Sequence, residues 1–101
     1  MTRARIDIPQ DKIAEFCRRH RIKRLSLFGS VLRDDFSDES DVDVLVEFEE
    51  GYTPGLYFFG LDSELSDVIG RQAEVHTPGF LSDHFRDDVI REAEVQYDAP
   101  R

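Results

Sequence analysis

The spacing of apolar residues along the chain predicts an alternation of short helices and strands. In some stretches apolar side chains recur every three to four residues, the period of a helix that is buried on one side. In others they recur every second residue or form a short β-branched run, which is typical of strands. The expected elements are a helix at 9–20, a strand at 24–28, a helical turn at 30–34, a polar loop at 35–40, a strand at 41–48, a loop at 49–55, a helix at 56–69, a strand at 72–76, a helix at 78–93 and an extended segment at 95–97.

The strand expected at 41–48 has the most regular pattern of these elements. Apolar residues occupy every second position from Val42 onward, and most of the run is β-branched. Because successive side chains of a strand point to opposite faces, Asp41 and Asp43 share one face with Leu45. The sequence therefore predicts two neighbouring carboxylates at the start of a buried strand.

The order of the elements predicts an α/β chain of the mixed α+β kind. We expect a small mixed sheet of about three to four strands with helices on one face. The other face would be open, and Asp41 and Asp43 would lie on it. A length of 101 residues without a long linker predicts a single domain, spanning residues 1–101, with one modest core.

The charge distribution argues against a nucleic-acid-binding surface. The net charge is −9, and residues 34–101 hold nineteen Asp or Glu against four Lys or Arg. Residues 1–33 hold nine Lys or Arg against three Asp or Glu, clustered at 18–24. That cluster is either a solvated helix end or a contact for an acidic partner or a short anion. Since most of the chain repels a polyanion, we expect no direct nucleic-acid binding.

Composition also favours a cytoplasmic setting without membrane contact. No apolar run has the length that a bilayer span requires, and the first residues lack the apolar core of a secretory signal. The chain has one cysteine, Cys17, which excludes an internal disulfide. A reduced, cytoplasmic environment is therefore expected.

Two short motifs combine into a candidate site for a metal-bound nucleoside triphosphate. Carboxylates at alternate strand positions lie about 6.6 Å apart at the backbone, so Asp41 and Asp43 can converge on magnesium ions. Gly29 permits close backbone approach, and Ser30 supplies donors for a phosphate at a helix start. Either motif alone is a weak signal, and Ser30 in particular also suits a helix cap. Together, in this order, they are specific.

These motifs resemble those of the minimal nucleotidyltransferases (MNT domains) of the DNA polymerase beta-like superfamily, the antitoxin half of HEPN/MNT pairs. The resemblance covers residues 9 to 98, and its segments are Leu27-Phe28-Gly29-Ser30, then after ten residues Asp41-Val42-Asp43 and Val44-Leu45-Val46, Phe59-Gly60-Leu61 with Leu65, Ile69-Gly70-Arg71, Ala73-Glu74-Val75, Thr77-Pro78, and Ile90-Arg91-Glu92-Ala93 with Tyr97. It implies a nucleotidyltransferase fold.

The resemblance also implies an activity: transfer of AMP from ATP with release of pyrophosphate. Asp41 and Asp43 would hold two Mg²⁺ ions. Glu74 stands where the family usually has aspartate, and it would complete the metal and catalytic set. Gly29 and Ser30 would hold the β- and γ-phosphates.

Three further residues have open interpretations. Arg33 either contacts phosphate or pairs with a neighbouring aspartate. Glu74 is either the third carboxylate or an ordinary exposed strand residue. His76 shares a face with Glu74, and we expect it to be incidental, because an exposed histidine near a strand end usually has no such role.

The partner implied by the resemblance is a HEPN toxin, a small helical ribonuclease that would receive AMP on a tyrosine, as in a type VII-like toxin–antitoxin pair. One alternative is an antitoxin without effective catalysis that neutralises the toxin by covering it. Another is modification of a small molecule, but enzymes of that kind carry an additional acceptor domain, for which this chain has no room.

Overall fold

The computed structural model describes residues 8–32, 37, 40–52, 54–81 and 83–100. Its elements in chain order are α1 (Gln10–Arg19), β1 (Ile22–Phe28), the 3₁₀ turn η1 (Gly29–Leu32), β2 (Val42–Phe48), the 3₁₀ segment η2 (Gly55–Gly60), α2 (Leu61–Ile69), β3 (Ala73–His76), the 3₁₀ turn η3 (Pro78–Phe80), α3 (Asp83–Glu92) and β4 (Glu94–Asp98). Arg33 and most of the expected polar loop lie outside the described residues.

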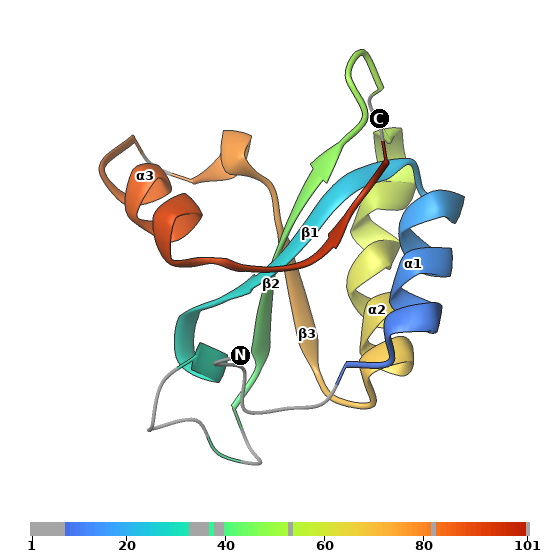
Figure 1. Cartoon of the computed structure of the whole chain (residues 1–101), viewed down its shortest axis with the longest axis horizontal. Helices are drawn as coiled ribbons and strands as arrows, with labels where there is room; N and C mark the ends of the chain where they lie inside the picture. The colour runs from blue at the N-terminus through green and yellow to red at the C-terminus, as the bar shows by residue number, and fades with distance from the viewer. Residues whose placement is uncertain (1–7, 33–36, 38–39, 53, 82, 101) are drawn as a thin grey trace.

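The four strands form one mixed sheet in the order β3-β2-β1-β4, seen at the centre of Figure 1. β1 pairs antiparallel with both β2 and β4. β2 pairs parallel with β3, and the connection between them contains α2. The predicted fold class is confirmed, and the extended segment expected at 95–97 is the edge strand β4.

One face of the sheet carries the main core. Phe16 of α1 and Leu65 of α2 are fully buried against the apolar side chains of β1 and β2. Val42, Val44 and Val46 all point into this core, as their alternation predicts. Cys17 lies in it too, and burial raises the pKa of its thiol to about 12.

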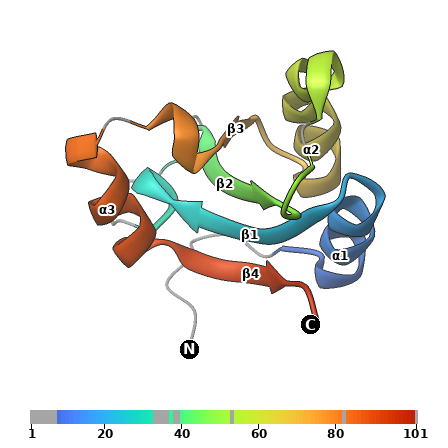
Figure 2. The same ribbon diagram turned by 90° about the horizontal axis from the view of Figure 1, so that it is seen from above.

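The opposite face is not fully open, which corrects the expectation of helices on one face only. Val89 of α3 is buried with Phe28 and Leu45 in a second, smaller cluster. Figures 1 and 2 both show α3 on the other side of the sheet from α1 and α2. Leu45 explains why α3 packs on this face. It lies on the same side of β2 as Asp43, and α3 shields its apolar side chain from water.

Two expected helices are shorter than their apolar spacing predicts. The first turns of the helix expected at 56–69 are the 3₁₀ segment η2, which starts at Gly55 with a φ of +74°. The helix expected at 78–93 is interrupted at Leu81, whose backbone is extended. The guanidinium of Arg86 donates to the carbonyl oxygens of Pro78 and Leu81 and so stabilises the interruption. Phe85, expected on the buried stripe, is therefore 52 % exposed.

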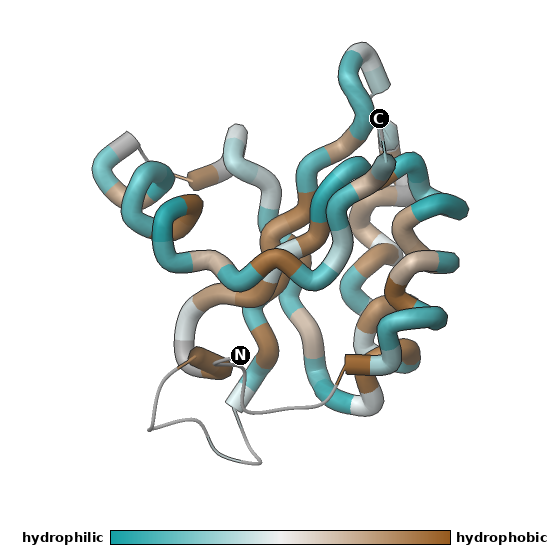
Figure 3. Tube along the Cα trace, viewed as in Figure 1, coloured by the Kyte–Doolittle hydropathy of each residue, from teal (hydrophilic) through white to brown (hydrophobic). Residues whose placement is uncertain are grey.

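The hydropathy of the chain follows this two-sided arrangement. In Figure 3 hydrophobic positions concentrate on the central strands, and hydrophilic positions cover the outward turns of α1 and α3. Among the described residues, none of the helices combines the length and the apolar character that a membrane crossing requires.

Packing of α1 against the sheet predicts a large stability difference between two phenylalanines. Phe16 is fully buried, whereas Phe59 is 80 % exposed. We expect Phe16→Ala to lower the free energy of unfolding by about 3–5 kcal/mol, because it leaves a cavity. The matched variant Phe59→Ala should cost less than about 1 kcal/mol. Urea denaturation of both variants checks this, and equal losses would contradict the assignment of α1 to the core.

Candidate active site

The parallel register of β2 and β3 brings two predicted site residues together. Asp43 pairs directly with Glu74, so both side chains point to the same face of the sheet. The next same-face position of β3 is His76, which pairs with Leu45. One ligand atom from each of Asp43, Glu74 and His76 lies within 4.8 Å of the others. This carboxylate–carboxylate–imidazole cluster is the centre of the candidate site.

His76 belongs to the cluster, contrary to the expectation that it is incidental. Its Nε2 lies 3.3 Å from Oδ1 of Asp43 and 3.8 Å from Oε2 of Glu74. The imidazole also makes an edge contact with the ring of Phe28, at 5.2 Å between centroids. In the sequence, the only indication is that Glu74 and His76 occupy alternate positions of one strand. The register of β3 against β2 is needed to show that both face the side that carries Asp43.

Asp41 lies one residue before β2 and is exposed. It is not one of the three groups within 4.8 Å of one another, but it acts on the cluster through its charge. The pKa of Glu74 is raised, first by desolvation and then by the negative charges of Asp43 and Asp41. Three carboxylates that repel one another in this way favour a bound cation, because the cation removes the repulsion.

The backbone at Gly29 comes close to the Asp43 carboxylate of the cluster. Gly29 follows β1, in which Phe28 pairs with Asp43, and its φ is +78°. A Cβ atom at this position would lie 2.6 Å from Oδ2 of Asp43. The Gly-Ser turn and the Asp43 carboxylate, predicted to meet, therefore do so at Gly29. The backbone of Ser30 continues into η1, while the Ser30 side chain and the whole of Arg33 lie outside what the structure describes.

A cavity of about 340 Å³ adjoins this cluster. Its lining residues come from four elements, β1, η1, β2 and α3: Phe28, Gly29, Asp43, Phe85, Asp88, Val89 and Glu92. The volume falls within the range of pockets that hold small ligands, about 300–1,000 Å³. α3 therefore forms one wall of the site. The apolar spacing does not indicate this contribution, because it predicts Phe85 to be a core residue.

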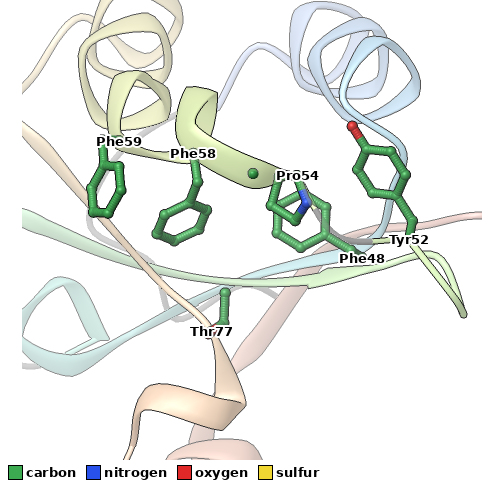
Figure 4. A pocket seen from close by; sticks show the side chains of 7 residues that line it. Phe48, Tyr52, Pro54, Phe58, Phe59 and Thr77 are labelled. Carbon is green, nitrogen blue, oxygen red and sulfur yellow. The ribbon is translucent and has the colours of Figure 1, made fainter.

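A second cavity, of about 320 Å³, lies away from these groups (Figure 4). It is lined by Phe48, Tyr52, Pro54, Gly55, Phe58, Phe59 and Thr77. Phe48 ends β2, whereas Asp43 is near its start, so this cavity is at the opposite end of the strand. Among the described residues, none that lines it is charged, so this lining does not offer the groups that a metal-bound triphosphate requires.

Comparison with known proteins identifies close relatives in sequence. The family model of the nucleotidyltransferase domain matches residues 11–96. The chain is 37 % identical over 82 residues to the "Putative protein adenylyltransferase MJ0435" of Methanocaldococcus jannaschii, covering 81 % of this chain and 87 % of that protein. It is 32 % identical over 79 residues to the "Protein adenylyltransferase MntA" of Thermococcus cleftensis, covering 77 % of this chain and 78 % of the relative.

Solved structures with a similar fold include nucleotidyltransferases. One described as a "putative minimal nucleotidyltransferase" superposes with a TM-score of 0.68 at 34 % identity, covering 83 % of this chain and 85 % of the other. A toxin–antitoxin structure with AMP-PNP gives a TM-score of 0.71 at 16 % identity over 91 % of this chain and 75 % of the other. The MntA–HepT toxin–antitoxin structure gives 0.63 at 15 % identity over 89 % and 70 %. The last two show the fold alone.

The fold, the matched family model and the sequence relatives lead to one assignment. The family model spans nearly all of the chain from α1 to β4. The resemblance to minimal nucleotidyltransferases that the Gly-Ser and Asp-Val-Asp motifs suggest is confirmed. The chain belongs to the nucleotidyltransferase domain family and is a nucleotidyltransferase.

Proposed function

We propose that this chain is a Mg²⁺-dependent protein adenylyltransferase, the antitoxin of a type VII-like HEPN/MNT pair. It transfers AMP from ATP to a tyrosine of its cognate HEPN ribonuclease toxin, in the cytoplasm. The observation that carries the proposal is the convergence on Asp43 of the Gly29 backbone from one side and Glu74 from the other. A phosphate-binding turn and a carboxylate pair thereby face the same space.

The donor set of the site fits magnesium. Asp43 and Glu74 are paired across the strands, and the charge of exposed Asp41 reaches Glu74. Magnesium is held by one or two protein carboxylates, with water and substrate phosphate completing its shell. We assign Asp41, Asp43 and Glu74 as the metal-binding and catalytic carboxylates. Ions held by these carboxylates would supply Lewis-acid chemistry, that is, positive charge against the phosphoryl oxygens and the leaving pyrophosphate.

The phosphate grip is assigned to the turn after β1. The positive φ of Gly29 brings the backbone close to Asp43, so a phosphate bound there would also approach the carboxylates. Ser30 would donate its N–H and hydroxyl to the β- and γ-phosphates. Arg33 would add a positive charge to the same phosphates, a role that competes with ion pairing to nearby aspartates.

The reaction follows from this arrangement. The tyrosine oxygen attacks the α-phosphorus of ATP, and the bond from that phosphorus to the bridging oxygen of the β-phosphate breaks. Tyrosine-bound AMP and pyrophosphate are formed, and the phenolic proton is released. Asp43 and Glu74, both at least partly exposed, could accept that proton directly or through water.

The partner assignment is supported by what the relatives and structural neighbours are. A sequence relative is named protein adenylyltransferase MntA, and chains of this fold occur in MntA–HepT complexes and in a toxin–antitoxin structure with AMP-PNP. The alternative is neutralisation by covering the toxin. Glu74 favours it, because it is longer than the usual aspartate and its side chain is 50 % exposed.

Removal of either carboxylate of the Asp-Val-Asp motif distinguishes catalysis from neutralisation by covering. Loss of a metal ligand removes charge stabilisation of several kcal/mol, so Asp41→Asn and Asp43→Asn should each lower AMP transfer by about a hundredfold or more. The measurement uses α-labelled ATP, Mg²⁺ and a HEPN ribonuclease encoded in the neighbouring reading frame, and it quantifies label on the ribonuclease.

The control for these variants is Asp67→Asn, which neutralises an exposed aspartate of α2 and should leave transfer unchanged. A toxin that remains unlabelled by the wild-type chain, yet is inhibited equally by wild type and both variants, would establish covering and refute the enzymatic proposal.

Gly29 and Gly51 provide a second, matched test. Their φ values are +78° and +79°, but only at Gly29 would a Cβ meet Asp43. Alanine at either position should cost about 1–2 kcal/mol of unfolding free energy, because left-handed backbone strains a residue with a Cβ. Gly29→Ala should also lower AMP transfer by about a hundredfold, since displacement of a catalytic group by about 1 Å has that effect. Equal transfer by the two variants would contradict the placement of the turn in the site.

A further inference from the structure

We infer that His76 is a nitrogen ligand of the metal ion held by Asp43 and Glu74, so that this position binds first-row transition ions more tightly than Mg²⁺. The inference rests on the proposed function in one respect only: the same carboxylates bind the ion. It adds a ligand type that carboxylates do not provide, and it changes which ion the site prefers.

The distances between the three groups suit a single ion. Nε2 of His76 lies 3.3 Å from Oδ1 of Asp43 and 3.8 Å from Oε2 of Glu74. Two ligands with metal bonds of about 2.0–2.2 Å are about 3–4.4 Å apart on the ion, according to their angle. Both observed separations fall in that range. The imidazole nitrogen therefore lies where a third ligand atom belongs.

The imidazole is held in place before any ion binds. His76 is opposite Leu45 in the parallel register, and its ring meets the buried ring of Phe28 edge-on. Its side chain is 32 % exposed, so the imidazole is only partly covered by this packing. A ligand fixed in this way loses little conformational entropy on coordination.

The other described histidines are placed differently. Nε2 of His20, the residue that follows α1, lies 2.7 Å from Oε2 of Glu64 on α2. His84 is exposed on α3 and is not part of the cluster. Of the histidines that the structure describes, His76 alone shares a cluster with two site carboxylates.

Ligand chemistry then sets the preference of the site. Mg²⁺ takes oxygen ligands almost exclusively and retains water. Imidazole suits transition ions, whose affinity for nitrogen-containing sites rises along the series from Mn²⁺ through Co²⁺ to Cu²⁺. One imidazole beside two carboxylates should therefore raise the affinity for Co²⁺ far more than that for Mg²⁺.

The same distances also allow a simpler role, in which His76 donates a hydrogen bond to Asp43 and only positions it. The two roles differ in what a substitution does. A positioning residue acts through Asp43, so its loss lowers the affinity for every metal ion by a similar factor. Loss of a nitrogen ligand lowers the affinity for Co²⁺ selectively. His76→Gln separates the roles, because its amide can still donate to Asp43 but has no imidazole nitrogen.

The experiment is calorimetric titration of the full chain with Co²⁺ and, separately, with Mg²⁺, without ATP or toxin. The variants are His76→Gln, His76→Val and the control His84→Gln. We expect both His76 variants to bind Co²⁺ at least about tenfold more weakly, with Mg²⁺ affinity changed less than about threefold in His76→Gln. His84→Gln should match the wild type. The visible absorption of bound Co²⁺, which depends on its ligands, should change in the His76 variants only.

Each other outcome refutes the inference. Wild-type Co²⁺ affinity in His76→Gln, or equal losses for Co²⁺ and Mg²⁺, would leave His76 as a positioning residue and the proposed function intact. Absence of any Co²⁺ binding by the wild-type chain would also refute the inference, whereas the proposed function, in which the phosphates of ATP complete the Mg²⁺ shell, is tested separately by the AMP-transfer assay. Thermal unfolding verifies that each variant is folded, and His76→Gln, the milder change, decides the question if His76→Val is unstable.

Discussion

The pairing of β2 with β3, two strands separated by α2, decides where the three clustered groups of the site lie. Its register places Asp43 opposite Glu74 and points both, with His76, to the same face. A slip by one residue would turn Glu74 and His76 toward the apolar core and leave Asp43 without neighbours. Parallel strands also require a crossover, and here α2 provides it on the face that α1 covers. The same connection that fixes the register therefore leaves the acidic face accessible.

The accessible face of the sheet holds several negatively charged side chains close together. Desolvation raises the pKa of Glu74, and the negative charges of Asp43 and Asp41 raise it further. The electrostatic repulsion in the cluster is therefore greatest when all three carboxylates are ionised and no cation is bound. His76 offers a nitrogen to the same space. A chain with a net charge of −9 places part of that charge where a bound cation would offset both the carboxylates and the phosphates of a nucleotide. The binding of cation and nucleotide is expected to be mutually dependent.

The C-terminal third of the chain completes the site from the other side. α3 buries Val89 against Phe28 and Leu45 and contributes Phe85 to the cavity wall, while β4 adds the edge strand beside β1. The apolar pattern predicts this helix, but the prediction that it lies with the others on one face is wrong. Apolar spacing shows that a helix has a buried side, but not which surface of the protein covers that side. The interruption at Leu81, stabilised by Arg86, likewise depends on contacts that the apolar pattern does not encode.

The sequence by itself determined the strands, the first two helices in outline, the mixed fold class and the pairing of a Gly-Ser turn with alternate carboxylates. These features follow from local periods and from the backbone freedom of glycine, both of which act within a few residues. Tertiary structure alone decided the placement of α3 and the inclusion of His76. The physical reason is that strand register and helix docking join residues distant in the chain, and no local period carries that information.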